Sequence, residues 1–269
     1  MLRVLSWNLY HGRDFPPDPA LFTWRSRLLR TTELGATHAQ VNRDLFEEFA
    51  ALIDGFPWDV ALFQEAPPRW FRGLGLRTRS NGTLARTSRN CLPPAQWLLA
   101  RHNPDLIASW EGGSNQLLAR APGRIRERRR LVLARKPERR SMQWARLELP
   151  WGELCVANLH ASAGLPDQAS RELVRAAEQS VEWSAEAPLV LGGDLNLRPG
   201  RDGEAFDEIE RRFGLRGITA PNAIDHLLSR GLEIVDAPRR LRAEERELPG
   251  PAGRLLRLSD HAPVTATFA

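Results

Sequence analysis

The sequence predicts an α/β fold, a single domain over residues 1–269 in which two β-sheets pack face to face and helices lie outside them. Three observations carry this prediction. Short apolar runs typical of buried strands recur along the chain, segments with helical spacing lie between them, and no repeat or linker divides the chain. The apolar fraction of 42% is ordinary for a globular protein and is enough for a substantial core.

The first 115 residues predict two strands with a helical region between them. Residues 2–9 form the first strand, and residues 20–54 are helical with a break near Gly35. Residues 58–63 form the second strand, which ends at a loop with two prolines. Residues 69–115 show no clear periodicity, so no element is predicted there.

The remainder of the chain predicts strands more densely. They fall at residues 115–120, 130–135, 143–149, 154–159, 188–191, 224–228 and 263–268. Residues 143–159 are a hairpin, and residues 123–130 are a basic loop between the first two of these strands. Helices are predicted at residues 166–186 and 204–213.

Four polar patches each follow an apolar run typical of a buried strand. The patches are residues 6–8 (SWN), 64–65 (QE), 192–196 (GGDLN) and 259–261 (SDH), the last after the arginine-interrupted run 255–258. Side chains at strand ends leave the core, and several such ends at one sheet edge would bring carboxylates and amides together. Oxygen donors of this kind suit Mg²⁺ or Mn²⁺. The pattern therefore predicts metal-assisted hydrolysis of a phosphate ester.

Asp194 and Asn196 are two residues apart after a buried strand, so in an extended chain their side chains point the same way. The carboxylate could orient or deprotonate a water, and the amide could donate to a phosphate oxygen. Glycines at 192 and 193 would allow the backbone to approach a ligand. The alternative is a tight turn with an aspartate helix cap.

His261 is a candidate because histidine changes charge near neutral pH. Asp225 could orient it, as a carboxylate orients the base in many hydrolases. The alternatives are a structural histidine and a solvated loop aspartate. His160 ends a predicted strand and could donate a proton to the leaving oxygen or bind phosphoryl oxygens.

Asn8 and Glu65 offer oxygen ligands for a metal. Glu65 comes one residue after a run of four apolar residues and would be costly to bury without a partner, which a cation could supply. His11 and Asp14 could line the same edge, but we interpret them as parts of an exposed loop.

The charge of the chain is compatible with a polyanionic partner. The net charge is +5, and every basic residue except Lys136 is an arginine. Residues 124–130 (RIRERRR) could contact phosphates, although a charge run is usually a solvated loop. This is weak support for nucleic acid.

Several observations favour a soluble, cytoplasmic protein. Two cysteines, Cys91 and Cys155, cannot make a disulfide framework and are expected to be reduced. A strand that begins at residue 2 argues against a preceding signal peptide. No apolar stretch approaches the roughly 18 residues of a transmembrane helix.

Taken together, six segments resemble the endonuclease/exonuclease/phosphatase superfamily, which includes deoxyribonuclease I, abasic-site nucleases, neutral sphingomyelinases and inositol-polyphosphate phosphatases. The segments are residues 5–8 (LSWN), 63–65 (FQE), 157–160 (ANLH), 193–196 (GDLN), 224–227 (IDHL) and 258–264 (LSDHAPV). Their order matches the family over the whole chain. The resemblance implies a four-layered α/β sandwich.

The resemblance also implies roles for individual residues. Asn8, Glu65 and Asp260 would surround a divalent cation, Mg²⁺ or Mn²⁺. Asp194 would orient or deprotonate the attacking water, while Asn196 and His160 hold the phosphate. His261, paired with Asp225, would bear on the scissile phosphate, and Asn115 in the family's central strand is a possible substrate-binding residue.

The leading expectation is a monomeric, metal-dependent phosphodiesterase, a nuclease that acts on DNA. One alternative keeps the chemistry and changes the substrate to a phosphomonoester, a lipid or a small phosphodiester. Another alternative is a non-catalytic nucleic-acid-binding domain on the same fold.

Overall fold

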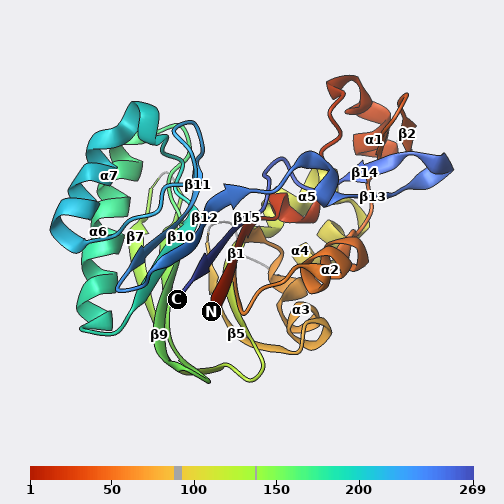
Figure 1. The fold of residues 1–269 in the computed structure, drawn as a ribbon. Coiled ribbons are helices and arrows are strands. Elements are labelled where there is room, and N and C mark those ends of the chain that lie inside the picture. The colour runs from red at the N-terminus through yellow and green to blue at the C-terminus, as the bar shows by residue number, and fades with distance from the viewer. Residues whose placement is uncertain (88–92, 137) are drawn as a thin grey trace.

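The computed structural model describes the chain except residues 88–92 and 137, and it contains two large β-sheets that pack face to face (Figure 1). The six-stranded sheet has the order β12 (Ile234–Arg240), β15 (Val264–Phe268), β1 (Leu2–Asn8), β4 (Val60–Ala66), β6 (Ser114–Arg120), β5 (Ser80–Arg86). The five-stranded sheet has the order β11 (Asp225–Arg230), β10 (Leu189–Asp194), β9 (Gly152–His160), β8 (Arg140–Leu149), β7 (Arg124–Ala134). Both sheets mix parallel and antiparallel pairs.

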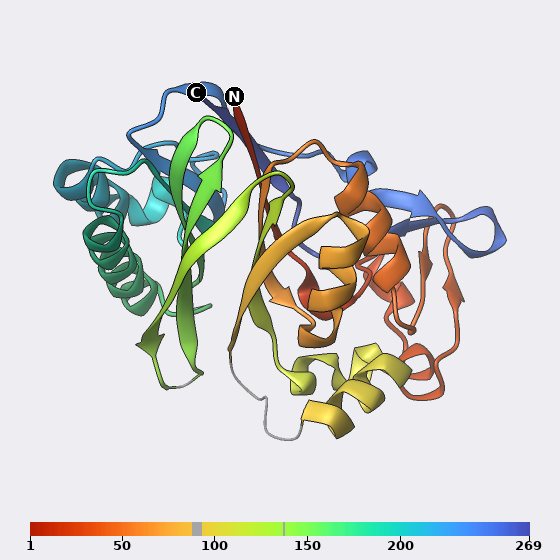
Figure 2. The same cartoon turned by 90° about the horizontal axis from the view of Figure 1, so that it is seen from below.

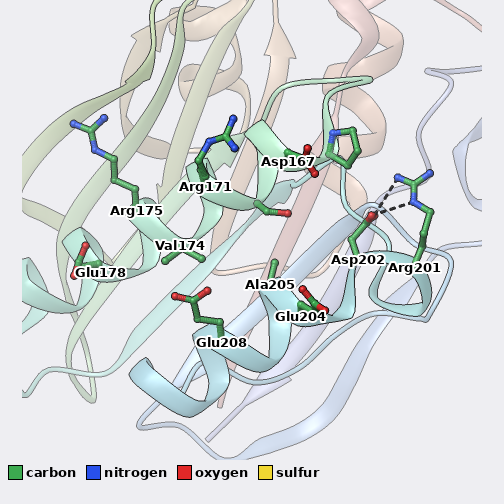
Figure 3. A pocket seen from close by; sticks show the side chains of 12 residues that line it. Asp167, Arg171, Val174, Arg175, Glu178, Arg201, Asp202, Glu204, Ala205 and Glu208 are labelled. Atoms are coloured by element: carbon green, nitrogen blue, oxygen red, sulfur yellow. Dashed lines mark hydrogen bonds and ion pairs between the residues drawn. The ribbon is translucent and has the colours of Figure 1, made fainter.

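Four of the seven helices in the described residues cover the outer faces of the two sheets, two on each sheet, as the view from below shows (Figure 2). The helices are α1 (Trp24–Leu29), α2 (Phe46–Gly55), α3 (Phe71–Arg77), α4 (Pro93–His102), α5 (Pro104–Glu111), α6 (Pro166–Ser184) and α7 (Pro199–Phe213). The helices α6 and α7 flank a groove of about 840 Å³ whose walls carry both acidic and basic side chains (Figure 3). No helix within the described residues is long and apolar enough to cross a membrane.

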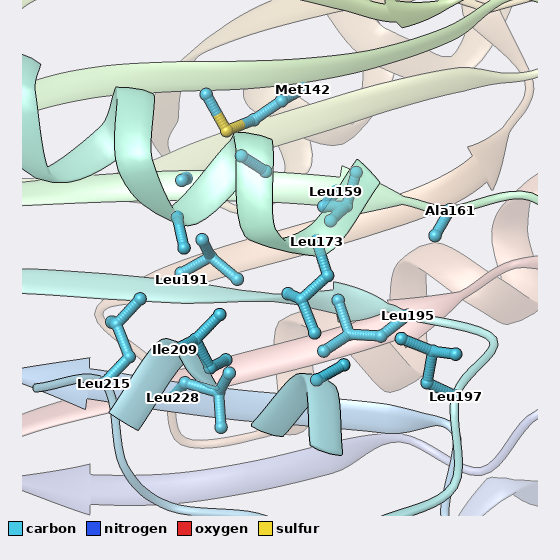
Figure 4. Close-up of a cluster of buried hydrophobic side chains, with 14 of the residues drawn as sticks. Met142, Leu159, Ala161, Leu173, Leu191, Leu195, Leu197, Ile209, Leu215 and Leu228 are labelled. Carbon is cyan, nitrogen blue, oxygen red and sulfur yellow. The ribbon is translucent and has the colours of Figure 1, made fainter. Parts of the chain in front are cut away.

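Three apolar cores fill the spaces between the layers. Leu62, Val156 and Val190 belong to the core between the two sheets. The five-stranded sheet packs on α6 and α7 through residues such as Leu191 and Leu173 (Figure 4). A third core lies between the six-stranded sheet and α2 and α3. The order helix, sheet, sheet, helix confirms the predicted four-layered α/β sandwich.

A buried polar contact ties the two sheets together at the end where β1, β4, β9 and β10 finish. Gln64 Nε2 donates to Asn158 Oδ1 at 2.8 Å, and Asn158 Nδ2 donates to the carbonyls of Phe63 and Gln116 at 3.0 and 2.9 Å. Gly193 lies beside this contact at φ +132°, where an added Cβ would be 1.9 Å from the carbonyl oxygen of Leu159. Only glycine fits such a position.

One sequence-based prediction is wrong in the N-terminal half, and elements form in one region for which none was predicted. The helical region predicted at residues 20–54 consists of α1 and α2 separated by the short strands β2 (Glu33–Leu34) and β3 (Ala39–Gln40). Residues 69–115, where no element was predicted, contain α3, β5, α4 and α5. Short helices and a half-exposed edge strand lack the long periodic pattern that identifies an element from sequence.

One further prediction is wrong, in the basic region. Residues 123–130 are not a loop, because β7 runs without interruption from Arg124 to Ala134 at the edge of its sheet. Charged side chains are common on edge strands. The run 255–258 contains the short strand β14 (Leu255–Arg257), which pairs with β13 (Glu247–Pro249) outside the two large sheets. Cys91 lies outside the described residues, and Cys155 is a buried free thiol in β9.

Candidate active site

The polar strand ends from both sheets meet at one edge of the sandwich. The parallel pairing of β1 with β4 places Asn8 beside Gln64, and the pairing of β10 with β9 places Asp194 beside His160. The two sheets touch here, because Asn8 Nδ2 donates to Asp194 Oδ2 at 3.0 Å. Residues distant in sequence are thus brought into one cluster.

Asp194 occupies the centre of this cluster. Its Oδ2 atom lies 3.5 Å from His160 Nε2 and 3.8 Å from His261 Nε2, while Oδ1 accepts a hydrogen bond from Asn196 N at 3.1 Å. Burial raises the pKa of Asp194 to about 7, the charge of Asp225 acts in the same direction, and His261 opposes both. The carboxyl group is therefore poised to gain or lose a proton near neutral pH.

His261 is paired with Asp225. Its Nδ1 atom lies 2.9 Å and 3.1 Å from the two carboxylate oxygens of Asp225. Burial lowers the pKa of His261, but the charges of Asp225 and Asp194 outweigh it and bring the pKa to about 10. At neutral pH this imidazole is positively charged.

Glu65 faces two histidines. Its carboxylate oxygens lie 3.3 Å from His11 Nε2 and 3.9 Å from His160 Nε2. Burial raises the pKa of Glu65, but nearby positive charge, chiefly that of His11, outweighs it and brings the pKa to about 2. Glu65 adopts φ +46°, which turns its side chain out of the strand direction at the end of β4.

The interpretation of His11 and Asp14 as exposed loop residues is wrong. The His11 side chain is largely buried beside Glu65. Asp14 is buried and accepts a hydrogen bond from Val41 N at 2.9 Å, and burial raises its pKa to about 8. The short helix η1 (Tyr10–Gly12) folds back on β4 and carries His11 into the cluster. The closeness of His11 to Asn8 in the sequence was the only signal for this.

Arg140 is a residue of the cluster that the sequence analysis missed. Its Nη1 atom lies 3.3 and 3.4 Å from the two ring nitrogens of His160. Burial lowers the pKa of His160 to about 3, and the positive charge of Arg140 adds to this effect. His160 is therefore neutral at physiological pH. One arginine among many, at the first position of an edge-proximal strand, gives no sequence signal.

Three other candidates lie at different depths. Asn196 adopts φ +52° beside Asp194 and donates from Nδ2 to Ala161 O at 3.0 Å. The Asp260 side chain is 31% exposed, and its Oδ1 is 4.0 Å from His261 Nε2. Asn115 is buried in β6, where Nδ2 donates to Ser141 O at 2.7 Å. The amide nitrogen of Asn115 thus contacts the β8 backbone.

The donor chemistry of the cluster suits a hard divalent cation. The side chains of Glu65 and Asp260 are 26% and 31% exposed. Burial raises the pKa of Asp260, and the negative charge of Glu65 raises it further, while His261 opposes both effects. Two like-charged carboxylates in one place favour a cation between them. Ligand atoms of Asp194, Asp225 and His261 also lie within 4.8 Å of one another. Asp194 and Asp225 are buried and His261 is held by Asp225, so the more exposed carboxylates of Glu65 and Asp260 are the better ligands.

The groove between α6 and α7 lies apart from this cluster (Figure 3). It contains none of the strand-end residues, and Arg201 within it is already paired with Asp202 at 3.0 Å. A mixed-charge groove without convergent catalytic groups does not compete with the strand-end cluster as the active site.

The chain matches the model of the "Endonuclease/Exonuclease/phosphatase family" over residues 5–261. No curated protein matched the chain.

Similar solved structures include the mannosyl-6-phosphatase of Bacteroides thetaiotaomicron, with 15% identity and TM-score 0.66 over 100% of each chain. The human Nocturnin catalytic domain has 15% identity and TM-score 0.64, with 100% of this chain and 93% of that chain covered. Truncated TDP2 of Caenorhabditis elegans has 15% identity and TM-score 0.60, with 99% and 96% covered. At these identities the likeness shows the fold alone.

The family match spans almost the whole chain and carries a chemical meaning. Members of the superfamily are phosphoester hydrolases that typically depend on a divalent metal. The residues matched, 5–261, include every strand-end side chain of the cluster described above. The chain therefore belongs to the endonuclease/exonuclease/phosphatase family.

Proposed function

We propose that this chain is a Mg²⁺- or Mn²⁺-dependent phosphodiesterase that cuts DNA. The observation that carries the proposal is the position of Asp194. Its carboxyl group has a pKa of about 7 and lies within 3.8 Å of two histidine side chains, next to a pair of accessible carboxylates. A general base, a charged imidazole and a set of metal ligands in one place suit phosphoryl transfer to water.

Glu65, Asp260 and the amide oxygen of Asn8 would hold the cation. When bound, it would neutralise charge on the phosphoryl oxygens and on the leaving oxygen. Asn8 can contact both Asp194 and the cation. Its Nδ2 donates to Asp194, while its Oδ1 accepts from Tyr10 N at 3.0 Å and keeps a second lone pair for the cation.

Asp194 accepts the proton of the water that attacks phosphorus. Hydrogen bonds from Asn8 Nδ2 and Asn196 N fix its carboxylate, so the water it binds is held in one direction. A base whose pKa is near the working pH combines availability with driving force. Asn196 lies beside Asp194, and its side-chain amide would donate a hydrogen bond to a phosphate oxygen.

The two histidines have different tasks because their charges differ. His261 is an imidazolium held by Asp225, and it stabilises negative charge that develops on the phosphoryl oxygens. His160 is neutral, so it acts as a hydrogen-bond donor to the phosphate and not as the acid that protonates the leaving oxygen. Asn115 would be a secondary contact to the substrate.

Arginines next to the cluster support a polyanionic substrate. Arg139 donates to the carbonyl of Thr87, and Thr87 N donates to Gly113 O beside Glu65. Arg140 lies at His160, and Arg130 donates to Ser141 Oγ at 3.1 Å. With a net charge of +5, this side of the site can contact phosphates that flank the scissile bond.

The test is nicking of supercoiled plasmid with Mg²⁺, with Mn²⁺ and with chelator. Native protein and an Asp207→Asn control, which changes an exposed carboxylate on α7, should nick only with metal. Asp194→Asn, which keeps the shape of the side chain, should be slower by about 10²–10⁴-fold because the base is lost. A folded native protein that does not nick with either metal would contradict the proposal, and turnover of phosphate monoesters instead would identify a phosphatase.

A further inference from the structure

Three aromatic rings form a continuous tract that starts at the candidate active site and runs outward. Tyr10 follows β1, and its N–H donates to Asn8 Oδ1 at 3.0 Å. The centroids of the Tyr10 and Phe15 rings lie 5.7 Å apart, and those of Phe15 and Phe22 lie 5.5 Å apart. The tract therefore connects a candidate metal ligand to the surface.

The outer rings are open to solvent and the first ring carries a cation. Phe15 and Phe22 are 37% and 42% exposed, so each packs against its neighbour and presents the rest of its ring to solvent. The guanidinium carbon of Arg13 lies 3.8 Å from the centroid of Tyr10. Aromatic rings together with arginine are the combination that binds single-stranded nucleic acid.

The rings belong to a fixed part of the fold. The carbonyl of Arg13 accepts a hydrogen bond from Ser259 N at 3.0 Å, and Phe15 N donates to Arg257 O at 2.7 Å. The segment is thus held to the chain just before Asp260 and His261. A platform that is already in place costs little conformational entropy when a ligand binds.

We propose that Phe15 and Phe22, at the outer end of the tract that begins at Tyr10, stack against unpaired nucleobases next to the scissile phosphate, so that the enzyme prefers single-stranded DNA. This inference rests on the proposed function and names its substrate class. Bases in a duplex are stacked on one another, whereas a single strand offers free faces. Exposed apolar side chains of α1, such as Trp24 and Leu28, would suit a lipid surface instead, and the experiment separates the two partners.

The experiment measures binding of a fluorescein-labelled single strand by anisotropy, with Mg²⁺ and in the Asp194→Asn background so that the strand stays intact. A Phe15→Leu/Phe22→Leu variant keeps apolar surface and loses the π-faces. It should bind at least about tenfold more weakly. The control variant is Trp151→Leu. Trp151 is similarly exposed and lies just before β9, at the end of the strand opposite to His160. This variant should bind the strand as tightly as its parent.

Two further ligands complete the test. A strand of the same length built from abasic nucleotides keeps the charge and lacks the bases, so the parent and the double variant should bind it equally. A duplex of the same sequence should likewise give no difference between them. Equal affinity of parent and double variant for the base-containing strand would overturn the stacking proposal.

The failures of the two proposals remain distinguishable. Absence of metal-dependent nicking by the native protein contradicts the DNA-cutting function, whereas the anisotropy measurement needs no turnover. The lipid alternative is tested by co-sedimentation with vesicles of phosphatidylcholine and phosphatidylglycerol. If the parent and the Phe15→Leu/Phe22→Leu variant both bind the vesicles, and bind them more tightly than DNA, the stacking proposal is overturned in favour of a lipid surface.

Discussion

Asp225→Asn should lower the pKa of His261 and narrow the pH range of activity. The carboxylate of Asp225 lies 2.9 Å from His261 Nδ1 and is the main cause that raises the pKa from 6.5 to about 10. This difference corresponds to at most about 5 kcal/mol of preference for the imidazolium. Removal of one adjacent carboxylate lowers a partner's pKa by roughly 1–3. We therefore expect the His261 of the variant to titrate between about pH 7 and pH 9.

The sign of the effect on stability follows from the same numbers. A histidine with a raised pKa in the folded state stabilises the fold fully below pH 6.5, and this contribution is lost as the pH rises through about 10. The native protein should therefore exceed the variant in stability most clearly at acidic and neutral pH. The gap should close as the pH approaches 10.

The assay pairs a spectroscopic titration with a rate profile. NMR of histidine-labelled, metal-free protein gives the titration of His261, and hydrolysis of bis(p-nitrophenyl) phosphate with Mg²⁺ gives the pH–rate profile. In Asp225→Asn the alkaline limb of the profile should move to lower pH, while the Asp207→Asn control keeps the native profile. A variant in which His261 titrates as in the native protein, with an unchanged profile, would refute the role of Asp225.

Four other expectations follow from the fold and the charges. Gly193→Ala should lower the free energy of unfolding by more than about 3 kcal/mol in urea titrations, because its Cβ would be 1.9 Å from Leu159 O at φ +132°. Gly203→Ala in α7, where a Cβ meets nothing within 4 Å, should be neutral or slightly stabilising by the same measurement. Asp14 has a pKa of about 8 in the folded state, so the fold binds more protons than the unfolded chain between about pH 4 and pH 8. The free energy of unfolding of the native protein should therefore decrease from about pH 4 to about pH 8, relative to that of Asp14→Asn. Thermal melts of both proteins at several pH values measure this difference. The affinity for single-stranded DNA should decrease linearly with salt concentration on logarithmic axes, and anisotropy at increasing NaCl measures the slope.

The sequence revealed those parts of the site that follow buried strands. The strands β1, β4, β9 and β10 are covered on both faces, so each is an apolar run that ends abruptly in polar residues. That contrast identified Asn8, Glu65 and Asp194 without any knowledge of the third dimension. It also gave the two-sheet architecture, since such runs need cover on both sides.

The parts that were missed depend on tertiary contacts. Arg140 and His11 reach the cluster through an edge-proximal strand and a one-turn helix, neither of which leaves a periodic signal. The arginines of β7 resemble a solvated loop because an edge strand exposes most of its length to water. The local sequence pattern indicates which residues are buried. It does not indicate contacts between segments far apart in the chain, and such contacts place these residues.

The candidate site lies where the two sheets meet, so its arrangement depends on their packing. Asn8 comes from one sheet and Asp194 from the other, so the 3.0 Å hydrogen bond between them depends on the distance between the sheets. Gln64 and Asn158 set that distance at the same end of the sandwich through a buried hydrogen bond of 2.8 Å. These two side chains lie between the layers and point away from solvent, so their task is positioning. A buried amide pair is costly unless every partner is in place, and it therefore favours one arrangement of the sheets, the one in which the groups around Asp194 converge.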